Sequence, residues 1–152
     1  MDAIDRRILR ELQINAALPI AELADRVGLS QSPCWRRVHK LEEAGVIAGR
    51  TIRVAPEAFG LGLTVYVEVT ALDHTPAWRA AFLAALEPIP EVMEVLRLGG
   101  AGDYLLRVVT ADMASYDAFY RRLTEAVPMR AVTSRFVMER LLSRPSLPPQ
   151  PS

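Results

Sequence analysis

The first third of the chain has apolar residues spaced as in amphipathic helices. The opening residues place three of them four positions apart: Ile4, Ile8 and Leu12. Residues four apart lie on one side of a helix, so this spacing predicts a helix over residues 2–14. Asp2 is suited to cap it, and Asp5 lies in the first turn, where the helix dipole favours a negative charge.

Two further helices are predicted, separated by a tight turn. Pro19 suits the first turn of a helix over residues 19–27, because that turn does not use its missing N–H group. Gly28 favours the left-handed conformation that ends a helix, and Ser30 is a good N-cap for a third helix over residues 31–44. The packed face of the third helix is predicted to consist of Cys34, Val38 and Leu41.

A short β-prone region follows the third helix. Residues 46–54 contain Gly49 between two β-prone runs, which predicts a small hairpin, or wing. Three short helices with a glycine turn before the third, followed by a hairpin, are typical of a winged helix-turn-helix. We therefore expect a DNA-binding domain over residues 1–54. Residues 55–62, with the sequence APEAFGLG, indicate a linker.

The rest of the chain alternates between strand-like and helix-like segments. Strands are predicted over residues 63–71, 92–98, 104–110 and 132–142, and helices over residues 76–86 and 113–126. The order βαββαβ in about 80 residues is the ferredoxin-like arrangement, so the predicted fold class is α+β. This second domain is expected to span residues 63–143, and a Pro-rich extended tail follows over residues 144–152.

The composition is that of a globular protein. Hydrophobic residues make up 51% of the 152 residues, which is enough for a packed core. No apolar run approaches the roughly 20 residues of a membrane helix, and the charged N-terminus is not expected to act as a signal peptide. A single Cys excludes an internal disulfide and fits the reducing cytoplasm. One Cys and two His are too few for a structural zinc site, so neither a metal nor another cofactor is expected.

The net charge of zero conceals an uneven distribution. Residues 1–53 hold nine Lys and Arg against seven Asp and Glu, whereas the remainder holds nine against eleven. A mildly basic first third permits binding to nucleic acid without requiring it.

The exposed side of the predicted third helix carries the candidate DNA-binding residues. They are Ser30, Gln31, Ser32, Trp35, Arg36, Arg37 and Lys40. The N-terminal end of a recognition helix usually meets base edges in the major groove, where Arg36 could bond guanine and Gln31 adenine. Lys40 and Arg37 are better placed for phosphates, which supply affinity but no sequence information.

Each of these assignments has a plainer alternative. Arg36, Arg37 and Lys40 together are also consistent with a solvated basic face, which is common on helices. Trp35 is either half-buried packing or a groove contact. Arg37 lies beside the packed side of the helix and is also placed to pair with an acidic residue of another helix. Cys34 is expected to be a small core residue rather than a nucleophile.

Residues 23–50, LADRVGLSQSPCWRRVHKLEEAGVIAGR, resemble the leucine-responsive/asparagine regulator (Lrp/AsnC) family. The opening residues Asp2–Leu9 and the later stretch Gly100–Leu106 are also similar to that family, and the resemblance extends over residues 2–142. It implies homodimers in which the sheets of the βαββαβ domains face each other (the dimeric α+β barrel type), often assembled into octamers. It also implies a regulator of amino-acid metabolism or transport genes that binds double-stranded DNA and, in many members, a free amino acid.

In that family the amino acid binds near the loop that matches residues 99–103, which makes this loop the candidate effector site. Its residues are Gly99, Gly100, Gly102 and Asp103, with Ser134 at a position of the last strand that is polar in the family. A glycine-rich turn exposes backbone N–H and C=O groups to an amino acid, and Asp103 could offset its ammonium charge. Equally, residues 99–102 could be only a hairpin turn. Two departures are Gly102, where an aromatic residue is frequent, and Pro128, where glycine is usual.

The leading hypothesis is a DNA-binding regulator with an amino-acid effector. The alternative is the same regulator without an effector, in which the second domain serves only for assembly. An enzyme is a different class, since ferredoxin-like dimers also host oxygenases and isomerases. No nucleophile motif or assignable carboxylate pair is present, however, and fold likeness alone does not carry a catalytic assignment. A protein–protein adaptor that uses the same winged helix is a further possibility.

Overall fold

The computed structural model describes residues 1–144 and 146–148. Contacts divide the chain into two compact units, one of residues 1–53 with the described residues after Arg140, and the other Val54–Arg140. The predicted Pro-rich tail falls partly on residues 145 and 149–152, which lie outside the described residues. Over the ranges that are described, no helix is both long enough and apolar enough to cross a membrane. The domain boundaries expected from the sequence stay a prediction.

The first helix, α1 (Ala3–Ile14), begins at a reciprocal cap. The Asp2 carboxylate accepts hydrogen bonds from the N–H groups of Ile4 and Asp5, at 2.9 and 2.8 Å. The Asp5 carboxylate in turn accepts one from the Asp2 N–H at 2.9 Å. These bonds satisfy donors that a helix leaves free at its start, so the predicted capping role of Asp2 is confirmed.

The predicted glycine turn joins α2 (Ile20–Val27) to α3 (Gln31–Glu43). Gly28 has φ 72°, in the left-handed region, and its N–H donates to the Ala24 carbonyl. A side chain in this conformation costs roughly 1–2 kcal/mol, which explains why glycine closes the helix. Ser30 takes the predicted N-cap position of α3, although its hydroxyl makes no capping hydrogen bond.

The three helices enclose a small apolar core. Its buried members are Ile8, Leu18, Leu23, Ala24, Val27, Cys34, Val38 and Leu41. Cys34 is fully buried, and this burial raises the pKa of its thiol. A protonated thiol is a poor nucleophile, so the prediction that Cys34 is a core residue is confirmed.

The wing predicted over residues 46–54 is not formed, because the structure has no strand in this segment. Val46, Ile52 and Val54 are 49%, 84% and 47% exposed. A two-stranded hairpin is marginal by itself and needs a packed face, which these exposed side chains do not provide. The predicted linker that follows contains a short 3-10 helix, η1 (Pro56–Phe59).

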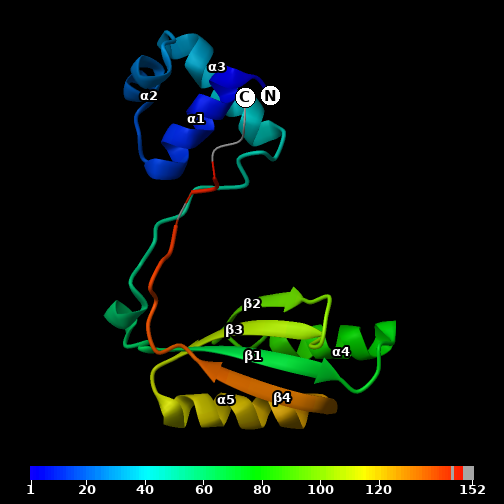
Figure 1. Ribbon diagram of the computed structural model, residues 1–152. Coiled ribbons are helices and arrows are strands. Elements are labelled where there is room, and N and C mark those ends of the chain that lie inside the picture. The colour runs from blue at the N-terminus through cyan, green and yellow to red at the C-terminus, as the bar shows by residue number, and fades with distance from the viewer. Residues whose placement is uncertain (145, 149–152) are drawn as a thin grey trace. The chain divides into compact units, whose positions relative to one another are not determined.

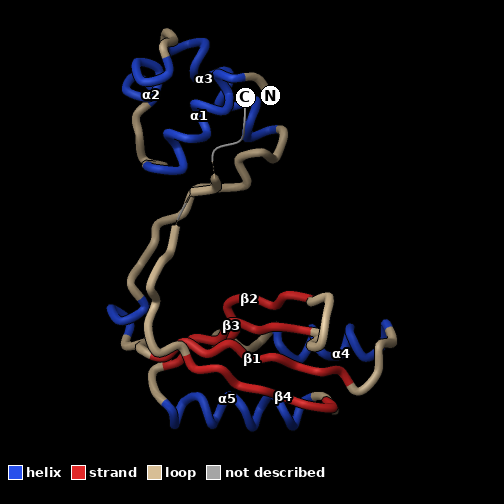
Figure 2. Tube along the Cα trace, in the orientation of Figure 1, coloured by secondary structure: helices blue, strands red, loops and turns tan. Residues whose placement is uncertain are grey.

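The second unit is an antiparallel sheet with two helices. Its elements are β1 (Leu63–Ala71), α4 (Pro76–Leu86), β2 (Val92–Arg97), β3 (Tyr104–Thr110), α5 (Met113–Ala126) and β4 (Met129–Phe136). The strands lie in the order β2-β3-β1-β4 (Figures 1 and 2). This is the ferredoxin-like topology, so the predicted α+β class is confirmed.

Both helices of this unit pack on one face of the sheet. Every second residue of β1 is buried, among them Val65, Val67 and Val69, because successive strand residues point to opposite faces. Side chains of both helices join these residues in one core: Trp78, Phe82, Leu86, Tyr116, Phe119 and Leu123. Tyr66 and Glu68 alternate with the buried residues, so they point to the other face, which has no helix within the described part of this unit.

Among the predicted helices and strands that form in the described chain, only β4 differs from its predicted bounds by more than one residue: it spans Met129–Phe136 rather than residues 132–142. The partner strand sets its length. β4 pairs with β1 throughout, and β1 begins only at Leu63. Within the described chain, residues after Val137 therefore have no strand to pair with. Three of the apolar residues that extended the prediction, Met138, Leu141 and Leu142, are exposed instead, and Met138 is 94% exposed.

Pro128, one of the two departures from the family pattern, directly precedes β4. Its carbonyl accepts a hydrogen bond from the Trp78 Nε1–H of α4 at 2.7 Å. Trp78 is buried and stacks on Phe82, with ring centroids 5.0 Å apart. Proline has no N–H to leave unpaired at the start of a strand, so this position is compatible with its place in the sheet.

We expect Gly28→Ala to destabilise the first unit by about 1 kcal/mol, because alanine would have to adopt the left-handed conformation. Gly49→Ala is the matched control, since Gly49 has no positive φ and a Cβ there meets no atom within 4 Å. Urea unfolding measures the loss, and hydrogen exchange of the amides in α2 and α3 assigns it to this unit. Equal stability of the Gly28 variant and the wild type would contradict the role of the turn.

Candidate DNA-binding surface and effector loop

The exposed side of α3 carries most of the predicted DNA-binding residues. The exposed side chains are Gln31, Ser32, Trp35, Arg36, His39 and Lys40, and the N-cap residue Ser30 is also exposed. Cys34, Val38 and Leu41 occupy the opposite, buried side. The predicted division of this helix into a packed and an exposed face is therefore confirmed.

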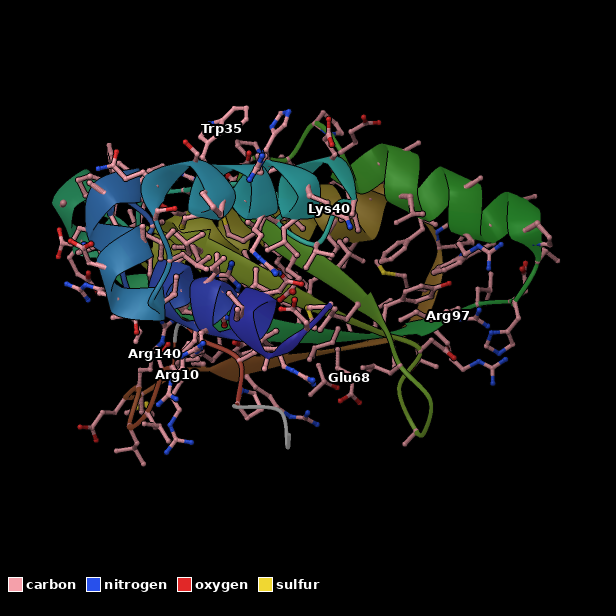
Figure 3. The ribbon with its side chains drawn as sticks, turned by 90° about the horizontal axis from the view of Figure 1, so that it is seen from above. Arg10, Trp35, Lys40, Glu68, Arg97 and Arg140 are labelled. Carbon is pink, nitrogen blue, oxygen red and sulfur yellow. The ribbon has the colours of Figure 1, made fainter. Side chains whose placement is uncertain are left out.

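Trp35 is an exposed aromatic residue on this face, not a packing residue. Its side chain projects from α3 (Figure 3), and the residue is 54% exposed. The indole stacks on the His39 ring, with centroids 5.2 Å apart and an interplanar angle of 16°. The stack fixes an apolar surface on the outside of the helix, of the kind that contacts thymine methyl groups in the major groove.

Arg37 is engaged inside the unit, which is the alternative that its place on the helix left open. Its Nη1 lies 2.7 Å from an oxygen of Asp2 and 2.7 Å from an oxygen of Asp5. The Asp5 N–H, followed by the Arg37 guanidinium, lowers the pKa of Asp2 to about 2. The two carboxylates also raise the pKa of Arg37. Arg37 thus ties α3 to the start of α1.

Arg36 and Lys40 remain available to a partner. Neither side chain makes an ion pair with any described residue. They border a shallow hollow of about 580 Å³ between α3 and the start of α1. Its lining consists of Met1, Asp2, Asp5, Pro33, Arg36, Arg37 and Lys40. Because Arg37 is neutralised by two acids, Arg36 and Lys40 supply the free positive charge on this surface.

In the second unit, the predicted effector loop joins β2 to β3, and Asp103 fastens it to the end of β1. The Asp103 N–H donates to the Val69 carbonyl at 3.1 Å, and its own carbonyl accepts from the Leu98 N–H at 2.8 Å. Its carboxylate accepts from the Ala71 N–H at 2.8 Å and lies 3.7 Å from Nδ1 of His74. Asp103 therefore has a structural role in closing this turn.

Glu68 lies beside this loop, although the sequence analysis did not single it out. It lies on β1, and its side chain crosses over the buried backbone of Gly102. Its carboxylate pairs with Nη1 of Arg135 on β4 at 2.9 Å. These residues are distant in the sequence, so only the register of three neighbouring strands brings them together.

Ser134 lies on the other side of the sheet from Glu68. It is opposite the buried Val67 in the pairing of β4 with β1, and its hydroxyl hydrogen-bonds the Tyr116 hydroxyl of α5. The structure therefore brings Gly99, Gly100, Gly102 and Asp103 together in one loop, but it directs Ser134 to the helices. In the described ranges, no group of three or more His, Cys, Asp or Glu side chains is arranged to hold a metal ion.

Comparison with known proteins places both units in one family. Residues 1–42 match the profile of the AsnC-type helix-turn-helix domain, and residues 64–147 match that of the Lrp/AsnC ligand binding domain. The chain belongs to the Lrp/AsnC family. This Lrp/AsnC protein is accordingly a DNA-binding transcription regulator and not an enzyme.

Relatives of this Lrp/AsnC protein resemble it over nearly their whole length. It is 41% identical over 149 residues to the DNA-binding transcriptional activator DecR of Escherichia coli, covering 97% of this chain and 98% of that protein. It is 39% identical over 148 residues to the glutamate uptake regulatory protein of Zymomonas mobilis, with 97% and 90% covered. A transcriptional regulator from Neisseria meningitidis, solved in complex with L-Met, has a TM-score of 0.92 at 34% identity, with 97% and 96% covered.

Arg37→Gln should raise the pKa of Asp2 from about 2, while leaving it below the ordinary 3.8 because the bond from the Asp5 N–H is retained. A carboxylate whose pKa is lowered by folding stabilises the folded state above its unfolded pKa. That contribution is lost as the pH falls through the folded pKa. The stability of the variant should therefore depend less on pH between 3.8 and about 2 than that of the wild type.

NMR titration of the Asp2 carboxyl and thermal unfolding at a series of pH values measure both effects. Arg36→Gln is the matched control, because it removes a neighbouring guanidinium that pairs with no described acid. If the Arg37 variant kept the wild-type pKa of Asp2 and the wild-type pH dependence, the ion pairs would not contribute to folding.

Proposed function

We propose that this Lrp/AsnC protein binds a specific double-stranded DNA sequence through α3 and regulates genes of amino-acid metabolism or transport. A free amino acid bound at the second unit modulates its DNA binding or its assembly. The main support for the proposed DNA binding is the exposed face of α3, on which amide, aromatic and unpaired basic side chains lie together.

In this proposal α3 enters the major groove with its N-terminal end against the bases. Gln31 bonds adenine and Arg36 bonds guanine, each through a bidentate contact. The Trp35 ring contacts thymine methyl groups. Lys40, one turn beyond Arg36, meets a phosphate and supplies affinity without sequence preference. Arg37 acts indirectly, by holding α3 in position.

We further propose that the protein acts as a homodimer. The uncovered face of the sheet carries Tyr66 and Leu105 together with two acid–guanidinium pairs, Glu68–Arg135 and Glu94–Arg107. This mixture is suited to a self-complementary contact with a second copy. A dimer presents two copies of α3 to two half-sites of a pseudo-palindrome, separated by about one turn of DNA or a small multiple of it. Dimers of this type are the unit from which octamers assemble.

The proposal that the protein binds an amino-acid effector is supported by features of the second unit. This unit matches a ligand-binding profile, and the regulator from Neisseria meningitidis, 34% identical, was solved with L-Met. The relative from Zymomonas mobilis is named for glutamate uptake. We therefore propose a free amino acid as the ligand and residues 99–103 as part of its site.

A specific observation also favours the same regulator without an effector. The Asp103 carboxylate already accepts a hydrogen bond from the Ala71 N–H. A loop with this bond needs no ligand to complete it and could serve only as a turn. In that case the second unit contributes assembly alone.

Fluorescence anisotropy with the DNA upstream of the protein's own gene tests these proposals. It is measured at two salt concentrations and with each of the twenty amino acids. We expect tight binding that weakens with salt, because phosphate contacts release counterions, and that one or a few amino acids alter. Binding that no amino acid alters would support the regulator without an effector. Failure to bind this DNA and a genomic library would contradict the DNA-binding proposal.

Arg36→Ala should weaken binding by about 1–3 kcal/mol and relax the preference at one base position, whereas Lys40→Ala should weaken binding almost equally on all sequences and reduce the salt slope by about one. Anisotropy with a panel of singly substituted operators measures both. Arg121→Ala, on α5 and paired with Asp117, is the control. An equal loss on every operator for the Arg36 variant would contradict its base-reading role.

A further inference from the structure

His39 occupies the middle of the exposed face of α3. It follows Arg36 by three residues and Trp35 by four, so the three side chains lie on one side of the helix. Trp35 marks this side in Figure 3. The His39 side chain is 53% exposed. A partner that contacts Trp35 and Arg36 is therefore also within reach of His39.

The two ring nitrogens of His39 face acids of the same helix at ion-pair distances. Nε2 lies 3.4 Å from Oε1 of Glu43, and Nδ1 lies 3.9 Å from Oε2 of Glu42. Both distances are too long for a good hydrogen bond. When they carry protons, the ring nitrogens can therefore donate to a partner outside the unit.

The two acids differ in what else offsets their charge. Glu42 accepts a hydrogen bond from the Arg50 guanidinium at 3.1 Å. Glu43 is 68% exposed, and His39 is its only ion-pair partner among the described residues. Glu43 lies one turn beyond His39 on the same side of α3, where a carboxylate repels the phosphates of DNA. A neutral imidazole leaves this charge in place, whereas a protonated one offsets it.

The neighbouring indole also favours the protonated ring. The His39 ring stacks on Trp35 with centroids 5.2 Å apart and an interplanar angle of 16°. A cation over the face of an indole is attracted by the negative charge of its π-system. A neutral imidazole has one N–H donor and an imidazolium has two. Protonation of His39 therefore adds a positive charge and a second donor at the same position.

We propose that His39 is a further DNA-contacting residue that acts in its protonated form, in which the imidazolium offsets the charge of Glu43 and donates a hydrogen bond to a DNA phosphate. This inference rests on the binding of DNA by α3 proposed above. DNA binding then takes up a proton, and the coupling is reciprocal, since DNA and the proton each favour the binding of the other. The affinity for DNA should therefore rise as the pH falls through the range, about pH 8 to 5, in which histidine side chains gain charge.

Other groups around α3 contribute less to this pH dependence. The thiol of Cys34 is buried, which raises its pKa and keeps it protonated. The amino group of Met1 can also titrate near neutral pH, and Met1 borders the hollow beside α3. The remaining charged groups near His39 are carboxylates, guanidinium groups and an ammonium group, which ordinarily titrate outside this range: Arg36, Lys40, Glu42, Glu43 and Arg50.

The second histidine of the chain provides a matched control. The sequence contains two histidines, and the other, His74, lies in the second unit, 3.7 Å from a carboxylate oxygen of Asp103. It is 75% exposed, so its replacement also changes an exposed ring near an acid. His74→Gln therefore makes the same chemical change away from α3.

Fluorescence anisotropy of the full chain with the DNA upstream of its own gene, from pH 7.5 to 5.5 at constant ionic strength, tests the assignment. The wild-type affinity should rise about tenfold over this range, as expected for one charge-assisted hydrogen bond. His39→Gln should lose most of this rise and change the affinity little at pH 7.5, because glutamine stays neutral. His74→Gln should behave as the wild type.

Two further measurements separate charge from other effects of the ring. His39→Lys carries a permanent charge, so at pH 7.5 it should bind about as tightly as the wild type does at pH 5.5. Calorimetry at pH 6.5 in two buffers of different ionisation enthalpy measures the protons taken up on binding. The wild type should take up more protons than His39→Gln, by up to about one for each bound α3.

The outcomes distinguish this assignment from DNA binding itself. A full wild-type rise in His39→Gln, or a His39→Lys variant no tighter than the wild type at pH 7.5, would overturn the role of His39 and leave the DNA-binding proposal intact. Wild-type binding with no pH dependence and no proton uptake would do the same, without depending on whether any variant folds. Failure of the wild type to bind this DNA and a genomic library at either pH would overturn both proposals.

Discussion

The alternation of side chains along β1 is the constraint on which the second unit depends. Val65, Val67 and Val69 face the helices and are fully buried, and Glu68 faces the other way. A shift by one residue would turn the valines out and bring Glu68 into the core. An unpaired carboxylate in an apolar core is so unfavourable that the register is strongly fixed. The register of β1 also sets the position of the loop between β2 and β3, because the Asp103 N–H donates a hydrogen bond to the Val69 carbonyl.

In the first unit, the corresponding constraint is the position of each basic residue around α3. Arg36 and Arg37 are neighbours in the sequence, yet the helix turns one outward and the other toward α1. Arg37 lies between Asp2 and Asp5, so its charge holds α3 against the start of α1. Arg36 keeps its charge for a partner. Position around the helix, rather than composition, decides which charge stabilises the fold and which is available to DNA.

The sequence predicted the elements whose signals are local. Helical spacing, the Asp2 cap and the Gly28 turn define the first unit, and runs of β-prone residues give the bounds of β1 and β3. Features that depend on pairing or packing with another segment of the chain were predicted less well. The end of β4 is set by the length of β1, and the hairpin of residues 46–54 lacks a surface on which to pack.

The candidate site shows the same limit. The exposed residues of α3 follow from a helical wheel, which also marked Arg37 as the uncertain member. For the candidate effector loop, the sequence predicted that the glycines, Asp103 and Ser134 would lie together, and the structure brings only the glycines and Asp103 into one loop. The strand register instead turns Ser134 toward Tyr116, while it brings Glu68, about 30 residues earlier in the chain, over Gly102.

Gly102 also shows why a departure from a family pattern has to be interpreted with its neighbours. An aromatic residue is frequent at this position in the family, and its loss by itself would leave the loop without a wall. Glu68 fills that space from the adjacent strand, so a side chain at residue 102 would have to displace the Glu68 carboxylate. The two positions therefore constrain each other. Beside the loop this chain therefore presents a carboxylate in the space that an aromatic ring would occupy.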